Sequence, residues 1–280
     1  MIITIAVAGA GTMGLGIALV AARAGYPTTL FDLNASVLEK AAAKIQSNLT
    51  YLTEKGAVTE LEASNIFGRI LFTSNLKDCI ANVIIEAIIE KPAIKVALFN
   101  KLALINSNKT IFASNTSSLS ITALQKKILM PGRVIGLHFF NPAPVMKLVE
   151  IVQGDQTNTT SIRLMKTLCR RMNKTAVLCK DAPGFIVNRI ARHYYLEAMQ
   201  MLTQGLASFE TVDAVMEGTG FKMGPFKLMD LIGMDINLAV SKSIYDAFKK
   251  APRFAPSPIQ IDKVNKGELG RKTGKGFYSY

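Results

Sequence analysis

Apolar residues form short, uninterrupted runs along the first two thirds of the chain. Ile2–Ala8 is almost wholly apolar, as expected of a parallel strand buried on both faces. Thr12–Ala24 then has helical spacing, and Gly25 follows it at a position where glycine often ends a helix. Thr28–Phe31 predicts a second strand and Ala35–Thr53 a second helix. Strand and helix therefore alternate from the start of the chain.

This alternation continues to about residue 180. Further strands are predicted at Ile70–Thr73, Val83–Ala87, Thr110–Ala113, Val134–Leu137, Leu148–Val152 and Ala176–Leu178. Helical stretches separate several of these runs, among them Pro92–Leu104, whose proline suits a first helical position. The pattern indicates an α/β fold, and we expect a doubly wound Rossmann-type domain over residues 1–183.

The periodicity changes at the turn Asp181-Ala-Pro-Gly184. After it, apolar residues have helical spacing in Phe185–Thr203, Ser208–Gly218 and Pro225–Lys249, with no clear strand. We therefore expect residues 184–280 to form a smaller, all-helical domain.

The composition is that of a folded globular protein, with 49% hydrophobic and 19% charged residues. No apolar run reaches the roughly 18 residues of a membrane-spanning helix, and no basic residue precedes the first apolar run as in a signal peptide. We expect a cytoplasmic protein without membrane contact. Cys79, Cys169 and Cys179 are expected to be reduced thiols, and with two histidines in the chain we expect no metal site.

The net charge of +13 favours an anionic partner. Basic residues exceed acidic ones in both parts of the chain, without a run of five, and motifs that bind nucleic acid are absent. A polyanionic small molecule fits better than nucleic acid. A solvated basic surface with no ligand is the alternative.

A dinucleotide-binding turn follows the first predicted strand. Gly9-Ala-Gly11-Thr-Met-Gly14 has the G-x-G-x-x-G spacing that lets a pyrophosphate approach the backbone at a helix N-terminus. Asp32 ends the second predicted strand, where a carboxylate binds the adenosine ribose hydroxyls and repels a 2′-phosphate. The context predicts NAD rather than NADP. A glycine-rich turn with no ligand is the alternative.

A nicotinamide enzyme that oxidises an alcohol needs a base, and histidine suits this task near neutral pH. His193 falls within a predicted helix, which favours a surface or packing role. His138 follows a predicted strand, and ligands bind at the carboxyl ends of such strands. His138 is therefore the candidate base.

The segment around His138 resembles the signature of the 3-hydroxyacyl-CoA dehydrogenase family. It reads Gly136-Leu-His-Phe-Phe-Asn-Pro-Ala-Pro-Val-Met-Lys-Leu-Val-Glu150. Other blocks of the family pattern occur in order: Ser114-Asn-Thr-Ser-Ser118, Asp181-Ala-Pro-Gly-Phe-Ile-Val-Asn-Arg189, Met223-Gly-Pro-Phe226 and Gly270-Arg-Lys-Thr-Gly-Lys-Gly-Phe-Tyr278. The length agrees with short, monofunctional members. Ala182 stands where threonine is common, and Leu19 where glutamine is common; neither departure affects the expected catalytic residues.

The resemblance implies a catalytic set. His138 would be the general base, Glu150 would hold its imidazole, and Ser117 and Asn188 would bind substrate oxygens and the cofactor amide. The residues implied to contact the cofactor are Gly9, Ala10, Gly11, Thr12, Met13, Gly14, Asp32, Glu90, Lys95, Ser117, Asn141 and Lys272. Each has a structural alternative: Ser117 and Asn188 could cap helices, and Glu150 could be a solvated acid.

The resemblance also implies that CoA contacts Ser117, Asn48 and Lys55, the last two on a helix that also carries Lys40 and Lys44. A helix that is basic only because it is solvated is the alternative.

The reaction implied is the NAD-dependent interconversion of a (3S)-3-hydroxyacyl-CoA thioester, of short chain by expectation, and its 3-oxoacyl-CoA. A dehydrogenase of a free hydroxyacid and a non-catalytic, crystallin-like or regulatory relative are the alternatives. The family's helical domain implies a homodimer, for which the apolar stretch Leu228–Val240 is a candidate interface.

Overall fold

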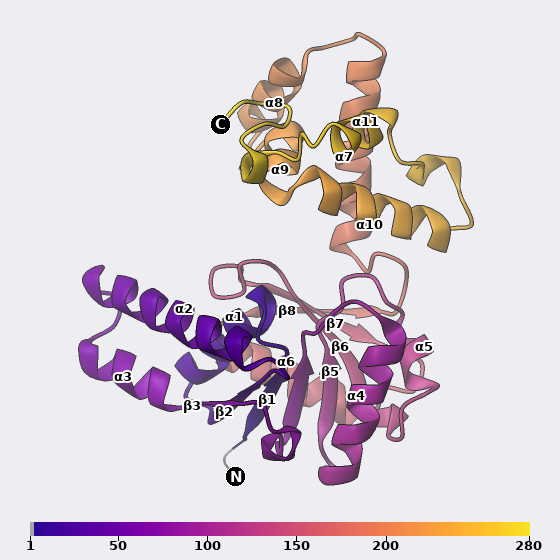
Figure 1. Ribbon diagram of the computed structural model, residues 1–280. Coiled ribbons are helices and arrows are strands. Elements are labelled where there is room, and N and C mark those ends of the chain that lie inside the picture. Colours follow the sequence, from indigo (N-terminus) through magenta and orange to yellow (C-terminus); the bar gives the residue numbers. More distant parts are fainter. Residues whose placement is uncertain (1–2) are drawn as a thin grey trace. The chain divides into compact units, whose positions relative to one another are not determined.

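The computed structural model describes residues 3–280, and the chain forms two compact units that divide after Asp181 (Figure 1). The first unit is built on a sheet and the second on helices. The prediction of an α/β fold with a helical C-terminal part is confirmed. Ile2, the first residue of the predicted N-terminal strand, lies outside the described residues.

The sheet of the first unit has the strand order β3-β2-β1-β4-β5-β6-β7-β8. Its strands are β1 (Ile5–Ala8), β2 (Thr28–Phe31), β3 (Ile70–Thr73), β4 (Val83–Glu86), β5 (Ile111–Ser114), β6 (Val134–Phe139), β7 (Leu148–Gln153) and β8 (Thr175–Lys180). Neighbouring strands are parallel except β6 and β7. The chain proceeds from β1 to β2 on one side and continues in β4 on the other, so the sheet order reverses beside β1. Open α/β sheets bind ligands at such a reversal.

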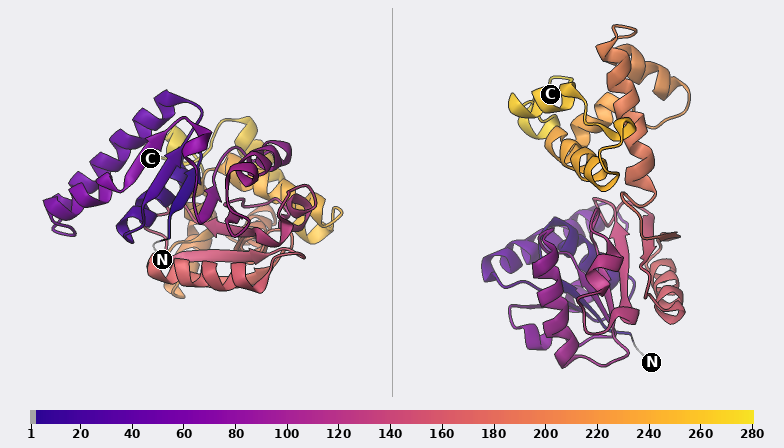
Figure 2. Two further views of the ribbon diagram at one scale, coloured as in Figure 1. Left: turned by 90° about the horizontal axis from the view of Figure 1, so that it is seen from below. Right: turned by 90° about the vertical axis from the view of Figure 1, so that its right-hand side faces the viewer.

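Helices cover both faces of this sheet (Figures 1 and 2). They are α1 (Thr12–Arg23), α2 (Ala35–Glu54), α3 (Glu60–Gly68), α4 (Pro92–Ile105), α5 (Ile121–Gln125) and α6 (Thr159–Arg171). The larger core joins α1 and α6 to one face, with Ile17, Val7 and Met165 fully buried. On the opposite face, the ring of Phe99 in α4 packs edge-on against Phe112 in β5, with ring centroids 5.6 Å apart.

The antiparallel pairing of β6 and β7 follows from the connection between them. Residues 140–147 are too few for the crossover helix that a parallel pair needs. The chain therefore turns back, and this register places His138 directly opposite Glu150.

The helical unit consists of α7 (Val187–Thr203), α8 (Phe209–Gly218), α9 (Pro225–Ile232), α10 (Met234–Ala247) and α11 (Pro258–Asn265). The prediction of one helix over Pro225–Lys249 was wrong. Gly233, with φ 100°, ends α9 and begins α10, because its left-handed backbone cannot continue a right-handed helix. The helix predicted to begin at Phe185 begins at Val187, since Phe185 itself has φ 49°.

The last residues of the chain are tied to Asp230 of α9, which is buried. Its carboxylate accepts hydrogen bonds from the backbone N–H groups of Phe277 and Tyr278, each at 2.9 Å. A Cβ on Gly276 would lie 2.0 Å from the same carboxylate, so only glycine fits there. The C-terminal sequence block thus has a packing role within the helical unit.

Three smaller expectations can be compared with the structure. The cysteines are free, and burial raises the pKa of Cys79 and Cys169 to about 12 and that of Cys179 to about 11, which keeps the thiols protonated at neutral pH. His193 is exposed and packs its ring against Phe254, with centroids 5.0 Å apart, in agreement with the expected surface or packing role. Within residues 3–280, no helix is both long and apolar enough to cross a membrane.

Candidate functional site

The glycine turn between β1 and α1 is packed so tightly that two of its glycines cannot be replaced. Gly9 has φ 101°, and a Cβ there would lie 2.6 Å from the carbonyl oxygen of Ala87. A Cβ on Gly14 would lie 1.7 Å from the carbonyl oxygen of Gly9, so α1 packs directly on the turn. A Cβ on Gly11, by contrast, would meet no atom within 4 Å. The turn is therefore closed toward the protein and open at Gly11, where a ligand can approach the backbone.

The N-terminus of α1 is suited to an anion. Gly11 is its N-cap residue and provides no side-chain hydrogen bond, and the first turn contains no acidic residue. The N–H groups at this end therefore lack the side-chain acceptor that usually caps a helix. A pyrophosphate can take that place, because the helix dipole and the N–H groups both favour negative charge.

Asp32 lies beside this turn. One of its carboxylate oxygens accepts the N–H of Ala10 at 2.9 Å and the other accepts the N–H of Asn34 at 3.0 Å. Both bonds fix the carboxylate at the carboxyl end of β2, next to the open side of the turn. This is the position from which an acid can bind ribose hydroxyls and repel a 2′-phosphate.

A cluster of two acids and a lysine lies on the other side of the reversal point, with Glu86 and Lys95 buried and Glu90 partly exposed. Glu86, the last residue of β4, pairs with Ala8 of β1 and Ser114 of β5 in the sheet register. Lys95 of α4 lies 2.5 Å from Oε1 of Glu86 and 3.0 Å from Oε2 of Glu90. Its amine also donates to the carbonyl oxygen of Ile88 at 3.4 Å. The three N–H bonds of this ammonium therefore all have acceptors within the protein, and Lys95 is 1% exposed.

The pKa values of the two acids shift in opposite directions. Burial raises the pKa of Glu86, although Lys95, the hydroxyl of Ser114 and the N–H of Ile88 partly offset it. Glu90 is also subject to burial, but Lys95 and the hydrogen bonds from Thr116 and Ser117 outweigh that effect and lower the pKa of Glu90. Glu90, whose side chain is 38% exposed, therefore stays ionised to a lower pH than Glu86.

The loop after β5 is anchored through this cluster. The hydroxyl of Ser114 donates to Oε2 of Glu86 at 2.6 Å. Glu90 accepts hydrogen bonds from the Thr116 hydroxyl, from the Ser117 N–H at 3.2 Å and from the Ser118 hydroxyl at 3.2 Å. The position of Ser117 thus depends on Glu90, and through Lys95 on Glu86.

His138 and Glu150 form a buried pair on neighbouring strands. Nδ1 of His138 lies 2.7 Å from Oε2 of Glu150, and both residues are at most 6% exposed. Their opposition in the antiparallel register fixes this contact through the backbone of two strands. A carboxylate at Nδ1 keeps a proton there in the neutral ring, so Nε2 is the nitrogen that can take a proton.

The segments near His138 are connected as well. Asn115 accepts the N–H of Phe139 through Oδ1 at 2.8 Å, which links the loop after β5 to the end of β6. The ring of Phe140 lies 4.5 Å from that of His138, centroid to centroid. Asn141, one of the predicted cofactor contacts, follows directly in the exposed connection to β7. The sheet unit thus gathers the glycine turn, Asp32, Glu90, Ser117 and His138 at the carboxyl ends of its parallel strands.

Other predicted residues lie elsewhere. Asn48 and Lys55 are on α2 and just after it, half-buried and exposed respectively, and the Lys55 amine stands 5.7 Å from the ring centroid of Tyr51. Asn188 is in the first turn of α7, where Ile186 is the N-cap, so Asn188 is not the capping residue. Lys272 pairs with Asp235 at 2.5 Å within the helical unit.

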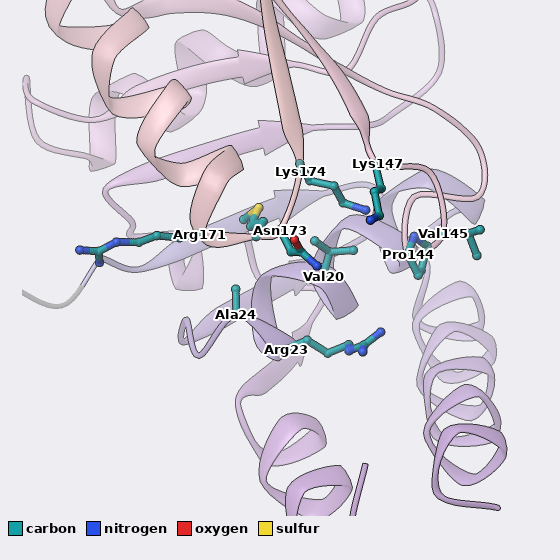
Figure 3. Close-up of a pocket in the computed structure, with 10 residues that line it drawn as sticks. Val20, Arg23, Ala24, Pro144, Val145, Lys147, Arg171, Asn173 and Lys174 are labelled. Carbon is teal, nitrogen blue, oxygen red and sulfur yellow. The ribbon is translucent and has the colours of Figure 1, made fainter. Parts of the chain in front are cut away.

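A separate basic pocket of about 240 Å³ occurs in the sheet unit and contains none of the predicted site residues (Figure 3). Arg23, Lys147 and Lys174 contribute side chains to it, while the guanidinium of Arg171 points away. Lys174 donates to the carbonyl oxygens of Ala143 and Met146 at 2.6 and 2.8 Å. This pocket accounts for part of the net positive charge without any carboxylate in its lining.

Sequence reasoning missed Glu86, Ser114 and Asn115 as contributors to the site. All three are at or just after the carboxyl ends of β4 and β5, the edge on which ligands bind in such sheets. A glutamate that ends an otherwise apolar strand, as in Val83-Ile-Ile-Glu86, was the available signal. Its partner Lys95, nine residues along the chain, could not be assigned without the fold.

Comparisons with known proteins agree with this geometry. A family profile described as "3-hydroxyacyl-CoA dehydrogenase, NAD binding domain" matches residues 4–182, and one described as "3-hydroxyacyl-CoA dehydrogenase, C-terminal domain" matches residues 184–280. The sheet unit is therefore an NAD-binding domain.

Similar proteins share both units. The chain is 43% identical to a 3-hydroxyadipyl-CoA dehydrogenase of Escherichia coli over 99% of its own length, but spans only 59% of that relative. It is 40% identical to a probable 3-hydroxybutyryl-CoA dehydrogenase of Deinococcus radiodurans, with 98% of this chain and 99% of the relative covered. The crystal structure of an (S)-3-hydroxybutyryl-CoA dehydrogenase from Ralstonia eutropha matches with a TM-score of 0.96 at 38% identity, covering 100% of this chain and 99% of the other.

Proposed function

Because this chain belongs to the 3-hydroxyacyl-CoA dehydrogenase family of NAD-dependent oxidoreductases, we propose that it interconverts short-chain (3S)-3-hydroxyacyl-CoA and 3-oxoacyl-CoA, with His138 and Glu150 as its acid–base pair. The observation that carries the proposal is the 2.7 Å contact between Nδ1 of His138 and Oε2 of Glu150 at the carboxyl end of β6. The preference for short acyl chains and the stereochemistry rest on the resemblance to the relatives and not on contacts seen in the structure.

His138 acts as the general base in the oxidative direction. Its Nε2 takes the proton of the 3-hydroxyl group, and in the reductive direction returns it to the oxygen of the 3-oxo group. The glycine turn and Asp32 would hold NAD⁺, which would supply the acceptor for the hydride from C3. Glu150 keeps the ring in the tautomer that presents a lone pair at Nε2 and stabilises the imidazolium that forms after proton transfer, as a carboxylate does in other histidine–acid pairs.

The other polar residues orient the substrate. Ser117, held at its backbone by Glu90, hydrogen-bonds the reacting oxygen of the substrate. For Asn188, in the first turn of α7, the resemblance supplies the role of binding a substrate oxygen or the cofactor amide. Cofactor contacts are assigned to Asn141, Glu90, Lys95 and Lys272, and Lys95 also forms an ion pair with Glu90. These assignments follow the resemblance. Contacts of this kind contribute to catalysis by holding the reacting carbon against the nicotinamide.

CoA binds along α2. Lys55 and Asn48 contact it, and Lys40 and Lys44, also exposed on this helix, add positive charge toward its phosphates. A dehydrogenase of free hydroxyacids would not need this basic surface, because its substrate carries no CoA phosphates.

The substrate assignment is tested by initial rates of NADH oxidation with acetoacetyl-CoA, free acetoacetate, 3-oxoadipyl-CoA and a series of longer 3-oxoacyl-CoA thioesters. We expect kcat/KM for acetoacetyl-CoA to exceed that for acetoacetate by at least about 100-fold, because the CoA contacts contribute binding energy that the free acid lacks. Equal values would favour the free-hydroxyacid dehydrogenase. A peak at 3-oxoadipyl-CoA would replace the short-chain assignment, and no turnover with any of them would favour a non-catalytic relative.

The helical unit is the proposed dimerisation domain. Leu231 and Ile236, on either side of the Gly233 break, are about half exposed, so α9 and α10 present apolar side chains that a second copy of the chain can cover. Size-exclusion chromatography with light scattering tests this assignment. A mass of one chain at micromolar concentration would exclude a stable dimer.

A further inference from the structure

We propose that Glu86 is a positioning residue for the cofactor and for Ser117, and that the net negative charge of the Glu86–Lys95–Glu90 cluster favours binding of NAD⁺ over NADH. No expectation drawn from the sequence included Glu86. The part that concerns turnover rests on the proposed function. The part that concerns cofactor affinity rests only on the NAD-binding domain.

The chain of contacts runs in one direction, from the sheet to the loop. Glu86 is fixed by β4 and is fully buried, and its oxygens accept from Lys95, Ser114 and the Ile88 N–H at 2.5 to 2.8 Å. Lys95 holds Glu90, which is on the exposed connection between β4 and α4. Glu90 in turn binds Thr116, Ser117 and Ser118. The rigid strand thereby determines the position of the half-buried loop that carries Ser117.

A purely structural role does not account for the choice of residues. Burying an ammonium and a carboxylate costs more desolvation energy than burying apolar side chains of similar volume, so an apolar pair would hold α4 against β4 at least as well. What the charged pair adds is a fixed ammonium that orders the partly exposed Glu90. The position at the reversal of the sheet, between β1 and β5, is also where the cofactor lies in folds of this type.

The charge of the cluster gives a second consequence. Two carboxylates and one ammonium leave a net charge of −1, and no other acid or base forms an ion pair with these three within residues 3–280. The nicotinamide ring is positively charged in NAD⁺ and neutral in NADH. A fixed negative charge at this edge of the sheet therefore stabilises the oxidised cofactor more than the reduced one.

The test is the Glu86→Gln enzyme, in which the side chain keeps its shape and loses its charge. Dissociation constants for NAD⁺ and NADH are measured separately by calorimetry, without any acyl-CoA. We expect the Kd for NAD⁺ to rise about tenfold and that for NADH about threefold or less, so that their ratio shifts by about threefold or more. Asp230→Asn is the matched control, because it neutralises a buried carboxylate of the helical unit. It should leave the ratio of the two Kd values unchanged.

Equal changes in both constants for Glu86→Gln, or a wild-type ratio, would overturn the charge effect. Ser114→Ala separates the positioning effect and remains informative if Glu86→Gln does not fold. It removes one hydrogen bond from Glu86 and leaves all charges. We therefore expect kcat to fall about three- to tenfold, while the ratio of the Kd values for NAD⁺ and NADH stays unchanged. A wild-type kcat for Ser114→Ala would overturn the positioning role. If the wild-type enzyme turned over no acyl-CoA, the proposed function would fail, while the two Kd values would still decide the charge effect.

Discussion

Buried carboxylates occur in both units of the molecule, but their partners differ. In the helical unit, Asp213 accepts the backbone N–H groups of Phe226 and Lys227, and Asp230 those near the C-terminus, all at 2.9 Å. Each of the two acids also accepts a hydrogen bond from a tyrosine hydroxyl, and neither is paired with a cationic side chain in the part of the chain that the structure describes. In the sheet unit, Glu150 faces a histidine and Glu86 faces a lysine. An acid bonded to backbone N–H groups fixes the path of the chain. An acid paired with a histidine or a lysine also fixes the direction of that side chain, which is what a reaction requires.

Among the substitutions that test this contrast, we expect His138→Gln to have the largest effect. Glutamine can keep a hydrogen bond but cannot take a proton near neutral pH, so kcat should fall by about 10³-fold or more. NADH binding and the melting temperature should stay close to wild type. Parallel measurement of steady-state rates and of NADH affinity checks this. A comparable loss of both would contradict the role of His138 as general base.

Glu150→Gln should have the next largest effect. The amide keeps the side-chain volume but cannot stabilise an imidazolium, so we expect kcat to fall about 10- to 100-fold with a smaller change in KM. Steady-state kinetics with acetoacetyl-CoA is the measurement. An unchanged kcat would remove Glu150 from the mechanism and make it another acid that serves only the fold.

Asp230→Asn tests the other part of the comparison, a buried acid that serves the fold of the helical unit. One oxygen of its carboxylate would be replaced by an NH₂ group facing a backbone donor, so we expect the free energy of unfolding to fall by about 1–3 kcal/mol. The kcat of the folded enzyme should change less than twofold. Denaturant unfolding and steady-state rates decide this. A large loss of kcat at unchanged stability would break the distinction between the two units.

Much of the fold could be predicted from the sequence, because it rests on local patterns. The glycine turn, Asp32 and the strand runs have spacings that determine their structure within about thirty residues. Elements with weak signals were missed, among them α3 (Glu60–Gly68) and α6 (Thr159–Arg171), and the Gly233 break was read through as helix. One glycine within a helical pattern is often tolerated, and only its φ of 100° shows that this one is not.

The resemblance supplied most residues of the candidate site, whereas contacts that join distant segments were missed. The pairing of His138 with Glu150 was implied by the resemblance, but its cause, an antiparallel register within a largely parallel sheet, was not foreseen. Glu86 and Lys95 are joined through the packing of α4 on β4, which no local pattern encodes. Lys95 was expected to contact the cofactor, which stays a prediction, but its three acceptors within the protein were not foreseen.

Asp32→Ala should have a smaller effect, on cofactor affinity. Loss of the carboxylate removes hydrogen bonds to the ribose hydroxyls and the repulsion of a 2′-phosphate. We expect the Kd for NADH to rise about tenfold and the discrimination against NADPH to weaken, since each factor of ten is about 1.4 kcal/mol. Titration with both cofactors checks it. An unaltered preference would place the discrimination in other residues.

The smallest effect concerns Glu268 in the helical unit. Hydrogen bonds from Lys263 and Lys275 lower the pKa of this half-buried acid to about 2, from an ordinary value of 4.5. A lowered pKa contributes stability above pH 4.5, and this contribution is lost as the pH falls from 4.5 toward 2. Wild type should therefore melt slightly above Glu268→Gln at pH 7, and the difference should shrink as the pH falls through this range. A difference that grows on acidification would contradict the assignment.

The most direct test of the account is a double-mutant cycle on the histidine–glutamate pair. If Glu150 acts only through His138, the enzyme with both His138→Gln and Glu150→Gln should have the same kcat as His138→Gln alone, because residues that act as a unit are not additive. The measurement is kcat with acetoacetyl-CoA for wild type, both single variants and the double variant. A double variant slower than His138→Gln by the full factor of Glu150→Gln would show that the two residues act independently and would contradict the proposed mechanism.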